Sequence, residues 1–313
     1  MATGYGLRAS GQQLVARGPL LATARGLSLV RVQHHLAHVA AGMAEHGLEP
    51  PLLGVAWDGT GYGMDGSIWG GEFLRVTERG WERFACLRPF RLPGGAAAVR
   101  EPRRAALGLL YELFGEDAAA MAQLAPVAAF TPAERRTLTA MLREGVNAPV
   151  CSSAGRLFDA VASLLGLCQI GTFEGQAACR LEWSARAGSV QRRYDFPLLT
   201  AGTARRLDWA PALRAILDDV AAGVPAADIA SAFHAGLAAG IVAVAAAAGI
   251  RRVLLTGGCF QNALLSALAA DALESAGRRV YWQEAVPPGD GGLALGQAWW
   301  TARLIATGEL SCA

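Results

Sequence analysis

An apolar run of β type, RRVLLTGG at 251–258, passes directly into a helical pattern, and this junction constrains the fold more than any other feature of the chain. A short and almost continuously apolar strand is typical of a parallel sheet that is covered on both faces. A further strand pattern at 278–286 and a final helical pattern at 292–308 follow it. Strands that alternate with helices in this way predict an α/β fold with parallel strands.

The first half of the chain carries a second set of strand and helix patterns. A β-type run at 27–32 precedes a histidine-rich segment whose helical spacing ends at Gly47, a residue typical of helix C-caps. Residues 1–24 show no sustained periodicity and are expected to form a weakly structured leader. The remaining expectations are strands at 51–57 and 67–76 around a glycine-rich turn, helices at 34–46 and 152–167, helical patterns over 100–146, and an irregular, then helical stretch at 186–230.

Composition places the chain among globular proteins. Hydrophobic residues make up 53% of it and charged residues 17%, which excludes the disordered and fibrous classes. The net charge is +2 and the basic residues are scattered, so no nucleic-acid partner is expected. The six cysteines contain no CxxC pair, which favours a reducing compartment and therefore the cytoplasm.

One apolar segment, AFHAGLAAGIVAVAAAAGI at 232–250, is long and uncharged enough to be considered as a membrane span. Its larger side chains recur at steps of four, four and three, so they lie on one face of a helix. These larger side chains are those of Phe233, Leu237, Ile241 and Val244. The pattern is typical of a core helix, and no membrane association is expected.

Three of the five histidines fall within the stretch QHHLAH at 33–38. His34 and His38 are four residues apart, so on a helix they share one face about 5–6 Å apart and can bind a single metal ion. Residue His35 points elsewhere and occupies the position that a glutamate base takes in zinc peptidases, which disfavours that chemistry. Histidines at this spacing are also common as structural or solvent-facing residues, and the spacing alone leaves both interpretations open.

Two aspartates follow strand patterns and are candidate oxygen ligands. Asp58 stands where an apolar strand ends and a glycine-rich turn begins, the place where open α/β sheets bind their ligands. It is also a good hairpin-turn residue. Asp290, in PPGDGG, is either a helix N-cap or a fourth ligand. Two histidines with two aspartates form a donor set that suits iron, zinc or manganese.

A second group of residues points to a nucleotide. Gly257 and Gly258 lie at the junction of a buried strand and a helix, where backbone amides and the helix dipole favour a phosphate, and Asn262 follows in the first turn. Close packing of the strand on the helix explains the glycines equally well. Asp159 and Glu174 are acids in apolar surroundings and are candidates for accepting hydrogen bonds from ribose hydroxyls.

Taken in order, these motifs resemble the C-terminal carbamoyltransferase domain of the HypF hydrogenase-maturation family. The resemblance extends over about residues 25–308 and implies a two-lobed, actin-like (ribonuclease-H-like) ATPase fold, related to the transferases that make threonylcarbamoyl on transfer RNA. The motifs that carry it are VQHHLAHVAAGMAEHG, GVAWDGTGYGMDGSIWGGEFLRV, LPGG, NAPVCSSAGRLFDAVASLLG, FEGQAACRLE, TGGCFQN and PPGDGGLALGQA.

The resemblance implies a specific reaction. A carbamoyl group, derived from carbamoyl phosphate and activated by ATP as carbamoyl-adenylate, passes to the C-terminal cysteine of the partner HypE, which supplies cyanide ligands for the nickel-iron centre. The resemblance implies a bound divalent metal ion, iron or zinc first and Mg²⁺ as an alternative. The family's metal ligands fall on His34, His38, Asp58 and Asp290, and the first three of these are also expected to be catalytic. The family's nucleotide motifs fall on Asp159, Glu174, Gly257, Gly258 and Asn262.

The resemblance also gives a division of the chain. Residues 25–148 are expected to be the remainder of a first lobe with a helical insertion, and 149–313 a second, nucleotide-binding lobe whose final helix returns to the first. The first lobe is expected to lack its opening strands, and a separate YrdC-like domain would form the adenylate. Two alternatives stand beside this function: an O-carbamoyltransferase acting on a small molecule, and an idle paralogue that binds HypE or nucleotide without turnover.

Overall fold

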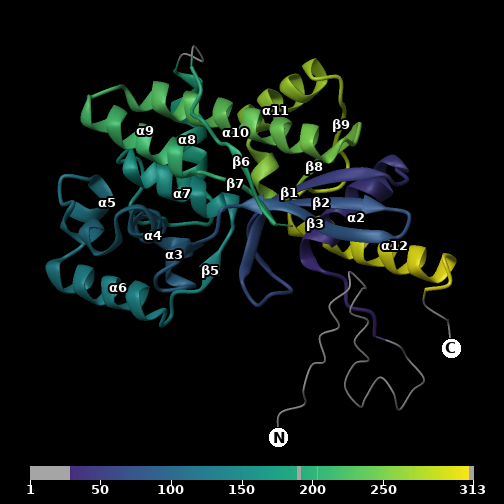
Figure 1. The fold of residues 1–313 in the computed structure, drawn as a ribbon, viewed down its shortest axis with the longest axis horizontal. Helices are drawn as coiled ribbons and strands as arrows, with labels where there is room; N and C mark the ends of the chain where they lie inside the picture. Colours follow the sequence, from purple (N-terminus) through teal and green to yellow (C-terminus); the bar gives the residue numbers. More distant parts are fainter. Residues whose placement is uncertain (1–28, 189–191, 203, 310–313) are drawn as a thin grey trace, which may run out of the picture.

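The computed structural model describes residues 29–188, 192–202 and 204–309, and within them a mixed sheet of nine strands runs through the middle of the molecule (Figure 1). Its main path has the order β6-β7-β3-β2-β1-β8-β9, and β4 and β5 are attached at β2. The predicted leader at 1–24 lies outside the described residues. The strands are β1 Leu52–Tyr62, β2 Ile68–Thr77, β3 Gly80–Leu87, β4 Phe90–Arg91, β5 Val150–Cys151, β6 Leu198–Ala201, β7 Ala204–Leu207, β8 Arg252–Thr256 and β9 Arg279–Trp282.

Helices cover both faces of the sheet and form most of the remaining molecule. In Figure 1, α2 and α12 lie on one side of the sheet and α10 and α11 on the other, while α3 to α7 form a helical region beyond its end. The helices are α2 His34–His46, α3 Ala97–Arg100, α4 Pro102–Phe114, α5 Ala125–Ala128, α6 Pro132–Glu144, α7 Ala154–Leu164, α8 Gln176–Arg186, α9 Ala210–Ala221, α10 Ala226–Ala248, α11 Ala263–Ser275 and α12 Leu293–Ala306, with 3₁₀ turns η1 Gly115–Ala120, η2 Gly258–Gln261 and η3 Asp290–Gly292.

Strand β1 is the centre of the fold because it is buried on both faces. Leu53, Val55 and Trp57 belong to the larger core under the helices α7 and α10, whereas Leu52 and Ala56 belong to a second core under α2 and α12. Successive side chains of a strand point to opposite faces, so a strand between two cores must be apolar throughout. β1 pairs in parallel with β8, β8 pairs in parallel with β9, and β1 pairs antiparallel with β2.

Helix α2 begins and ends with clear signals. The side-chain oxygen of Gln33 accepts a hydrogen bond from the N–H of Leu36 at 2.9 Å, and Gly47 ends the helix in the left-handed conformation at φ 58°. The helix lies close against the sheet because Gly54 has no side chain: a Cβ there would overlap Val39. α2 is thereby held in a fixed position over the ends of β1 and β8.

Most of the predicted elements are confirmed, and some predictions are wrong. The α/β class, the parallel strand at 251–258 and the helices after His34 and in 152–167 are present. The strand predicted at 27–32 is not: residues 29–32 have no regular structure, and 27–28 lie outside the described residues. The stretch at 186–230, predicted to be irregular before its helices, contains the hairpin β6–β7, whose register joins Leu198 to Leu207.

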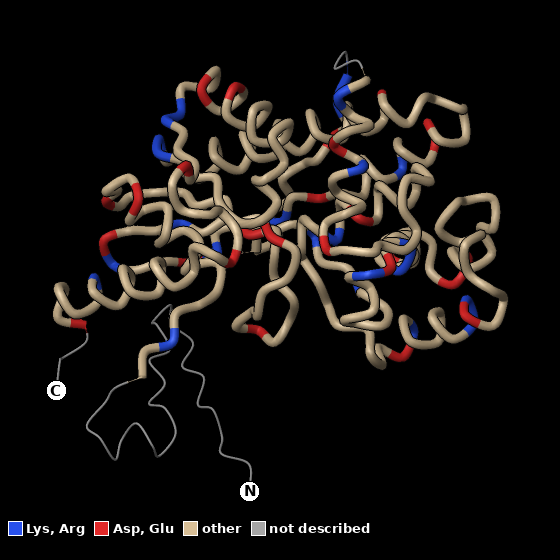
Figure 2. Tube along the Cα trace, turned by 180° about the vertical axis from the view of Figure 1, so that it is seen from behind, with Lys and Arg blue, Asp and Glu red and all other residues tan. Residues whose placement is uncertain are grey.

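The apolar segment at 232–250 lies in α10 up to Ala248, and α10 is the one described helix long and apolar enough to cross a membrane by length and composition. In its most apolar window 72% of the residues are buried inside the protein, as expected of a core helix. Charged residues are interspersed over the described trace, with blue and red segments alternating (Figure 2).

Candidate metal centre

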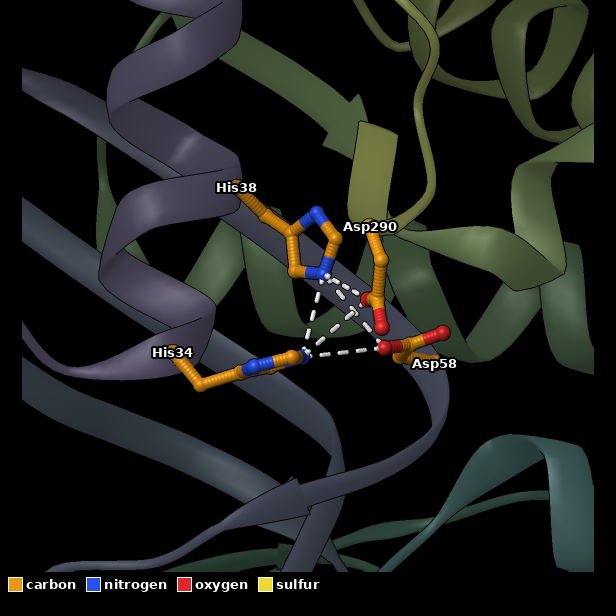
Figure 3. Close-up of side chains that lie close together, drawn as sticks. All are labelled: His34, His38, Asp58 and Asp290. Carbon is orange, nitrogen blue, oxygen red and sulfur yellow. Dashed lines mark hydrogen bonds and ion pairs between the residues drawn. The ribbon is translucent and has the colours of Figure 1, made fainter. Parts of the chain in front are cut away.

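The ends of three parallel strands meet beside the first turns of α2. β1 passes from its buried part to the exposed hairpin at Asp58, β8 ends at Thr256, and the loop after β9 returns to Asp290. In sheets of this kind ligands bind in the crevice outside the carboxyl ends of the strands. The histidines of α2 face the same place (Figure 3).

Four side chains converge there and offer two nitrogens and two oxygens. Nε2 of His34 lies 3.2 Å from Nε2 of His38, and each of these nitrogens lies 3.2–3.3 Å from Oδ2 of Asp58. Oδ1 of Asp290 lies 3.6 and 3.5 Å from the same two nitrogens. All four donor atoms lie within 4.8 Å of one another, so the structure brings together the four residues predicted as metal ligands.

This donor set fits a divalent cation. Ligand atoms bound tetrahedrally at about 2.0–2.1 Å from a zinc ion lie roughly 3.3–3.4 Å apart, and the separations of the histidine nitrogens from the other donors are 3.2–3.6 Å. The two imidazole nitrogens and the two carboxylate oxygens point toward one another, and a cation between them would bind all four atoms at once.

The charge state of Asp58 suits this role. Burial alone would raise the pKa of the Asp58 carboxyl, but hydrogen bonds from His34 and His38 hold that pKa well below its usual range. The N–H of Gly258 donates to the second oxygen, Oδ1, at 3.2 Å. The carboxylate is therefore ionised and fixed in orientation, as a ligand must be.

His35 lies outside the group, as predicted. It is fully buried, its ring stands 5.9 Å from that of Trp69, and Nδ1 is 3.2 Å from the side-chain nitrogen of Gln33. Burial, together with the nearby His34 and His38, lowers the pKa of His35 to about 3, so the ring is neutral.

The glycines of the DGTGYG turn serve the close approach of these rings. A Cβ on Gly61 would overlap both His34 and His35, and one on Gly63 would overlap Trp69. The glycine density of this turn is thus accounted for at these two positions by the packing of the hairpin over α2.

The predicted nucleotide residues lie on the other side of Asp58, although they do not all point into one space. The guanidinium of Arg156 and the carboxylate of Glu174 both lie within 4 Å of the position that a Cβ on Gly59 would take. Arg156 Nη2 also forms an ion pair with Asp159 Oδ2 at 3.0 Å. Glu174 is exposed, whereas Arg156 and Asp159 are buried.

The Arg156–Asp159 pair is unusual for its position inside the protein. Burial raises the pKa of the Asp159 carboxyl to about 6, although the neighbouring guanidinium acts in the opposite direction. Nε and Nη1 of Arg156 are buried and have no hydrogen-bond acceptor among the described residues. A buried guanidinium with free donors has a strong preference for an anion. Sequence reasoning missed Arg156, because an arginine in the first turn of an amphipathic helix is ordinarily a surface residue.

The double glycine is required by packing. Gly257 has φ 96°, which favours glycine, and a Cβ there would overlap the carbonyl oxygen of Trp57. A Cβ on Gly258 would come within 2.8 Å of Asp58 Oδ1. Close packing and ligand positioning therefore both depend on these glycines, and their contact with a nucleotide stays a prediction.

The side chain of Asn262 is engaged within the protein. Its oxygen accepts from the N–H of Leu265 at 2.9 Å as the N-cap of α11, and its nitrogen lies 2.9 Å from Nε2 of His234. The nucleotide-binding role predicted for Asn262 also stays a prediction.

Comparisons with known proteins place the site in a family. The sequence profile for the family described as carbamoyltransferase, Kae1-like domain, second subdomain, matches residues 54–297. Carbamoyltransferase HypF of Synechocystis sp. is 41% identical over 286 residues, which cover 87% of this chain and 37% of that protein. The carbamoyltransferase HypF homolog of Cupriavidus necator is 40% identical over 284 residues, which cover 88% of this chain and 71% of that protein.

Solved structures agree with the sequence relatives. The crystal structure of full-length HypF in the phosphate- and nucleotide-bound form matches with a TM-score of 0.83 and 34% identity, over 91% of this chain and 44% of that one. The structure of T. kodakarensis HypF matches with a TM-score of 0.79 and 31% identity, over 92% and 38% of the two chains. The predicted actin-like α/β fold is confirmed. The chain spans 37% of the length of the Synechocystis relative.

Proposed function

The chain belongs to the family of Kae1-like carbamoyltransferase domains, and on that premise we propose that it transfers a carbamoyl group from carbamoyl-adenylate to the C-terminal cysteine of HypE in the maturation of nickel-iron hydrogenases. The carbamoyl-adenylate is formed from carbamoyl phosphate and ATP by a separate YrdC-like domain. The reaction takes place in the cytoplasm.

One observation carries the proposal: the four-residue donor cluster includes Asp58, and the buried Arg156, which pairs with Asp159, lies within 4 Å of a Cβ position on the next residue, Gly59. A carbamoyl-adenylate has a carbonyl oxygen and, next to it, an anionic phosphate. The first suits a cation held by His34, His38, Asp58 and Asp290, and the second suits the free donors of Arg156. Both groups therefore lie beside the same short stretch of β1, as the two adjacent ends of an acyl phosphate would need.

In this reaction the protein mainly positions its substrate. The thiol of HypE loses its proton, its sulfur forms a C–S bond with the carbamoyl carbon, and the C–O bond to the phosphate breaks, so that AMP leaves. A bound divalent cation would act as a Lewis acid on the carbonyl oxygen. Arg156 would hold the departing phosphate, and Glu174 and Asp159 would accept hydrogen bonds from ribose hydroxyls.

The test is to incubate the metal-loaded chain with synthetic carbamoyl-adenylate and HypE, and to weigh HypE by mass spectrometry. We expect a gain of one carbamoyl group on the C-terminal cysteine, absent from HypE with that cysteine changed to serine. Asp58→Asn should reduce the initial rate at least about 100-fold, since it removes a charged ligand. Release of AMP without any gain of mass on HypE would contradict the proposal and favour an idle or small-molecule-directed relative.

A further inference from the structure

The carboxylate of Glu45, in the last turn of α2, accepts hydrogen bonds from three successive backbone amides. Oε1 accepts from the N–H groups of Glu284 and Ala285, both at 2.8 Å, and Oε2 accepts from that of Val286 at 3.2 Å. These amides belong to the loop between β9 and η3, which ends at Asp290. We propose that Glu45 is a positioning residue for Asp290: it holds this loop on α2 and so delivers the fourth ligand to the histidines.

Asp290 depends on backbone contacts of this kind because its side chain makes few contacts of its own. Its side chain is 72% exposed, and within the described residues only His34 and His38 lie at ion-pair distance from its carboxylate. The position of the carboxylate therefore depends on the path of the loop. An exposed carboxylate that must meet the nitrogens of two fixed imidazole rings loses binding energy when its backbone moves by even about 1 Å.

The loop is attached at both of its ends. On the side of the sheet, the N–H of Gly257 donates to the carbonyl of Pro288 at 2.9 Å, and the side-chain nitrogen of Gln283 donates to that of Pro287 at 3.3 Å. On the side of α2, Glu45 provides the attachment, next to a contact of 2.7 Å between His46 Nε2 and the carbonyl of Trp282. Glu45 is thus one of the contacts that hold the loop against the helix carrying both histidines, together with His46 and the packing of α12 on α2.

Three amides that converge on one carboxylate make a strong attachment. Hydrogen bonds to an ionised oxygen are shorter and roughly twice as strong as neutral ones. The amides of 284–286 overcome the effect of burial and lower the pKa of Glu45, so the anchor is charged at neutral pH. One helix therefore organises three ligands of the cluster, two directly and the third through Glu45.

The proposal rests on the metal site and is tested by a double-mutant cycle on Zn²⁺ affinity, measured by competition with a chromogenic chelator. Glu45→Ala should weaken binding about 10–100-fold, as the loss of a supporting residue does at other metal sites. In an Asp290→Ala background the same change should matter less than about twofold, because the ligand it positions is gone. Glu45→Gln keeps one acceptor oxygen and should fall in between.

Glu49→Ala is the matched control. Glu49 lies four residues further along and pairs with Arg303 at 2.8 Å, without contact to the loop, so its removal should leave the affinity unchanged. Equal weakening by Glu45→Ala in both backgrounds would overturn the proposal, because it would show a general effect on the fold.

Hydrogen exchange separates this proposal from the proposed function. In the metal-free protein, Glu45→Ala should speed the exchange of the 284–286 amides at least about tenfold, while amides of β1 and β8 keep their rates. Unchanged exchange would overturn the anchoring itself. If exchange speeds up but the wild-type chain binds no Zn²⁺, the metal function fails and the anchoring of the loop stands.

Discussion

At the scale of the residue, His234 shows how burial decides the protonation of a side chain. It is fully buried on α10; its Nδ1 lies 2.7 Å from the carbonyl of Ala230, which can only accept, so Nδ1 carries the proton. Nε2 then accepts from the side-chain nitrogen of Asn262 at 2.9 Å. Burial lowers the pKa of His234, because a charged ring would lack solvent and would repel the amide donor.

This arrangement makes the stability of the fold depend on pH. The pKa of His234 in the folded chain lies below the unfolded value of about 6.5. As the pH falls below about 6.5, His234 therefore binds a proton in the unfolded chain but not in the folded one, and the folded state loses stability. In urea titrations between pH 7 and 5, His234→Asn should have a shallower slope than the wild type, by up to about 1.4 kcal/mol per pH unit. Asn262→Ala keeps the titrating ring and should keep the slope. Equal slopes for His234→Asn and the wild type would contradict the explanation.

The residues of the site differ in whether the sequence alone can predict them. The spacing of His34 and His38 and the position of Asp58 at a strand end are local signals, so their grouping is predictable. Arg156 and Glu45 carry no such signal. The first becomes distinctive only through its burial beside Gly59, and the second only through a loop about 240 residues away in sequence.

At the scale of the element, the contact between α2 and α12 depends on one glycine. A Cβ on Gly296 would overlap the carbonyl oxygen of Ala37 and come within 2.9 Å of the N–H nitrogen of Ala41. These backbone atoms cannot give way without moving the helix. The close packing of α12 therefore supports the same turns of α2 that carry His38.

Gly296→Ala should destabilise the chain, because the added methyl group forces the two helices apart against a close-packed core. We expect a loss of roughly 1–3 kcal/mol in the free energy of unfolding, measured by urea denaturation. Ala298→Ser adds an atom at an exposed position of the same helix and should change the stability by less than about 0.5 kcal/mol. A Gly296→Ala variant as stable as Ala298→Ser would show that the helices adjust freely.

The elements themselves differ in how far the sequence predicts them. Strands β1 and β8 lie between two cores, and their apolar runs identify them without tertiary information. The hairpin β6–β7 lies at the edge of the sheet, and most of its described residues are exposed. Its sequence has no alternation of apolar and polar residues, because pairing of β7 with β3, rather than burial, holds it in place. The strand predicted at 27–32 is wrong for the opposite reason. Its described part, residues 29–32, is apolar enough for a strand but pairs with no strand of the described chain.

At the scale of the whole molecule, the candidate metal cluster joins parts of the chain that are far apart in sequence. Two of its residues come from the first described helix, the third from β1, and the fourth from the turn before the last helix. The parallel pairing of β1, β8 and β9 is what brings them together. An unfolded chain cannot hold the four side chains at one point, so a cation binds the folded state alone and stabilises it.

Metal removal should therefore lower the melting temperature. At a free Zn²⁺ concentration of about 100 times the dissociation constant, binding adds about 2.7 kcal/mol to the free energy of unfolding, which corresponds to roughly 4 °C for a chain of 313 residues. Differential scanning calorimetry should show this rise on adding Zn²⁺ and its reversal by EDTA.

His38→Ala removes a fully buried side chain of the cluster, and the melting temperature of this variant should rise by less than about 1 °C on adding Zn²⁺. Glu116→Ala, which breaks an exposed ion pair with Arg143 far from the site, should respond like the wild type. A His38→Ala variant with the full wild-type rise would contradict the expected role of His38 as a ligand.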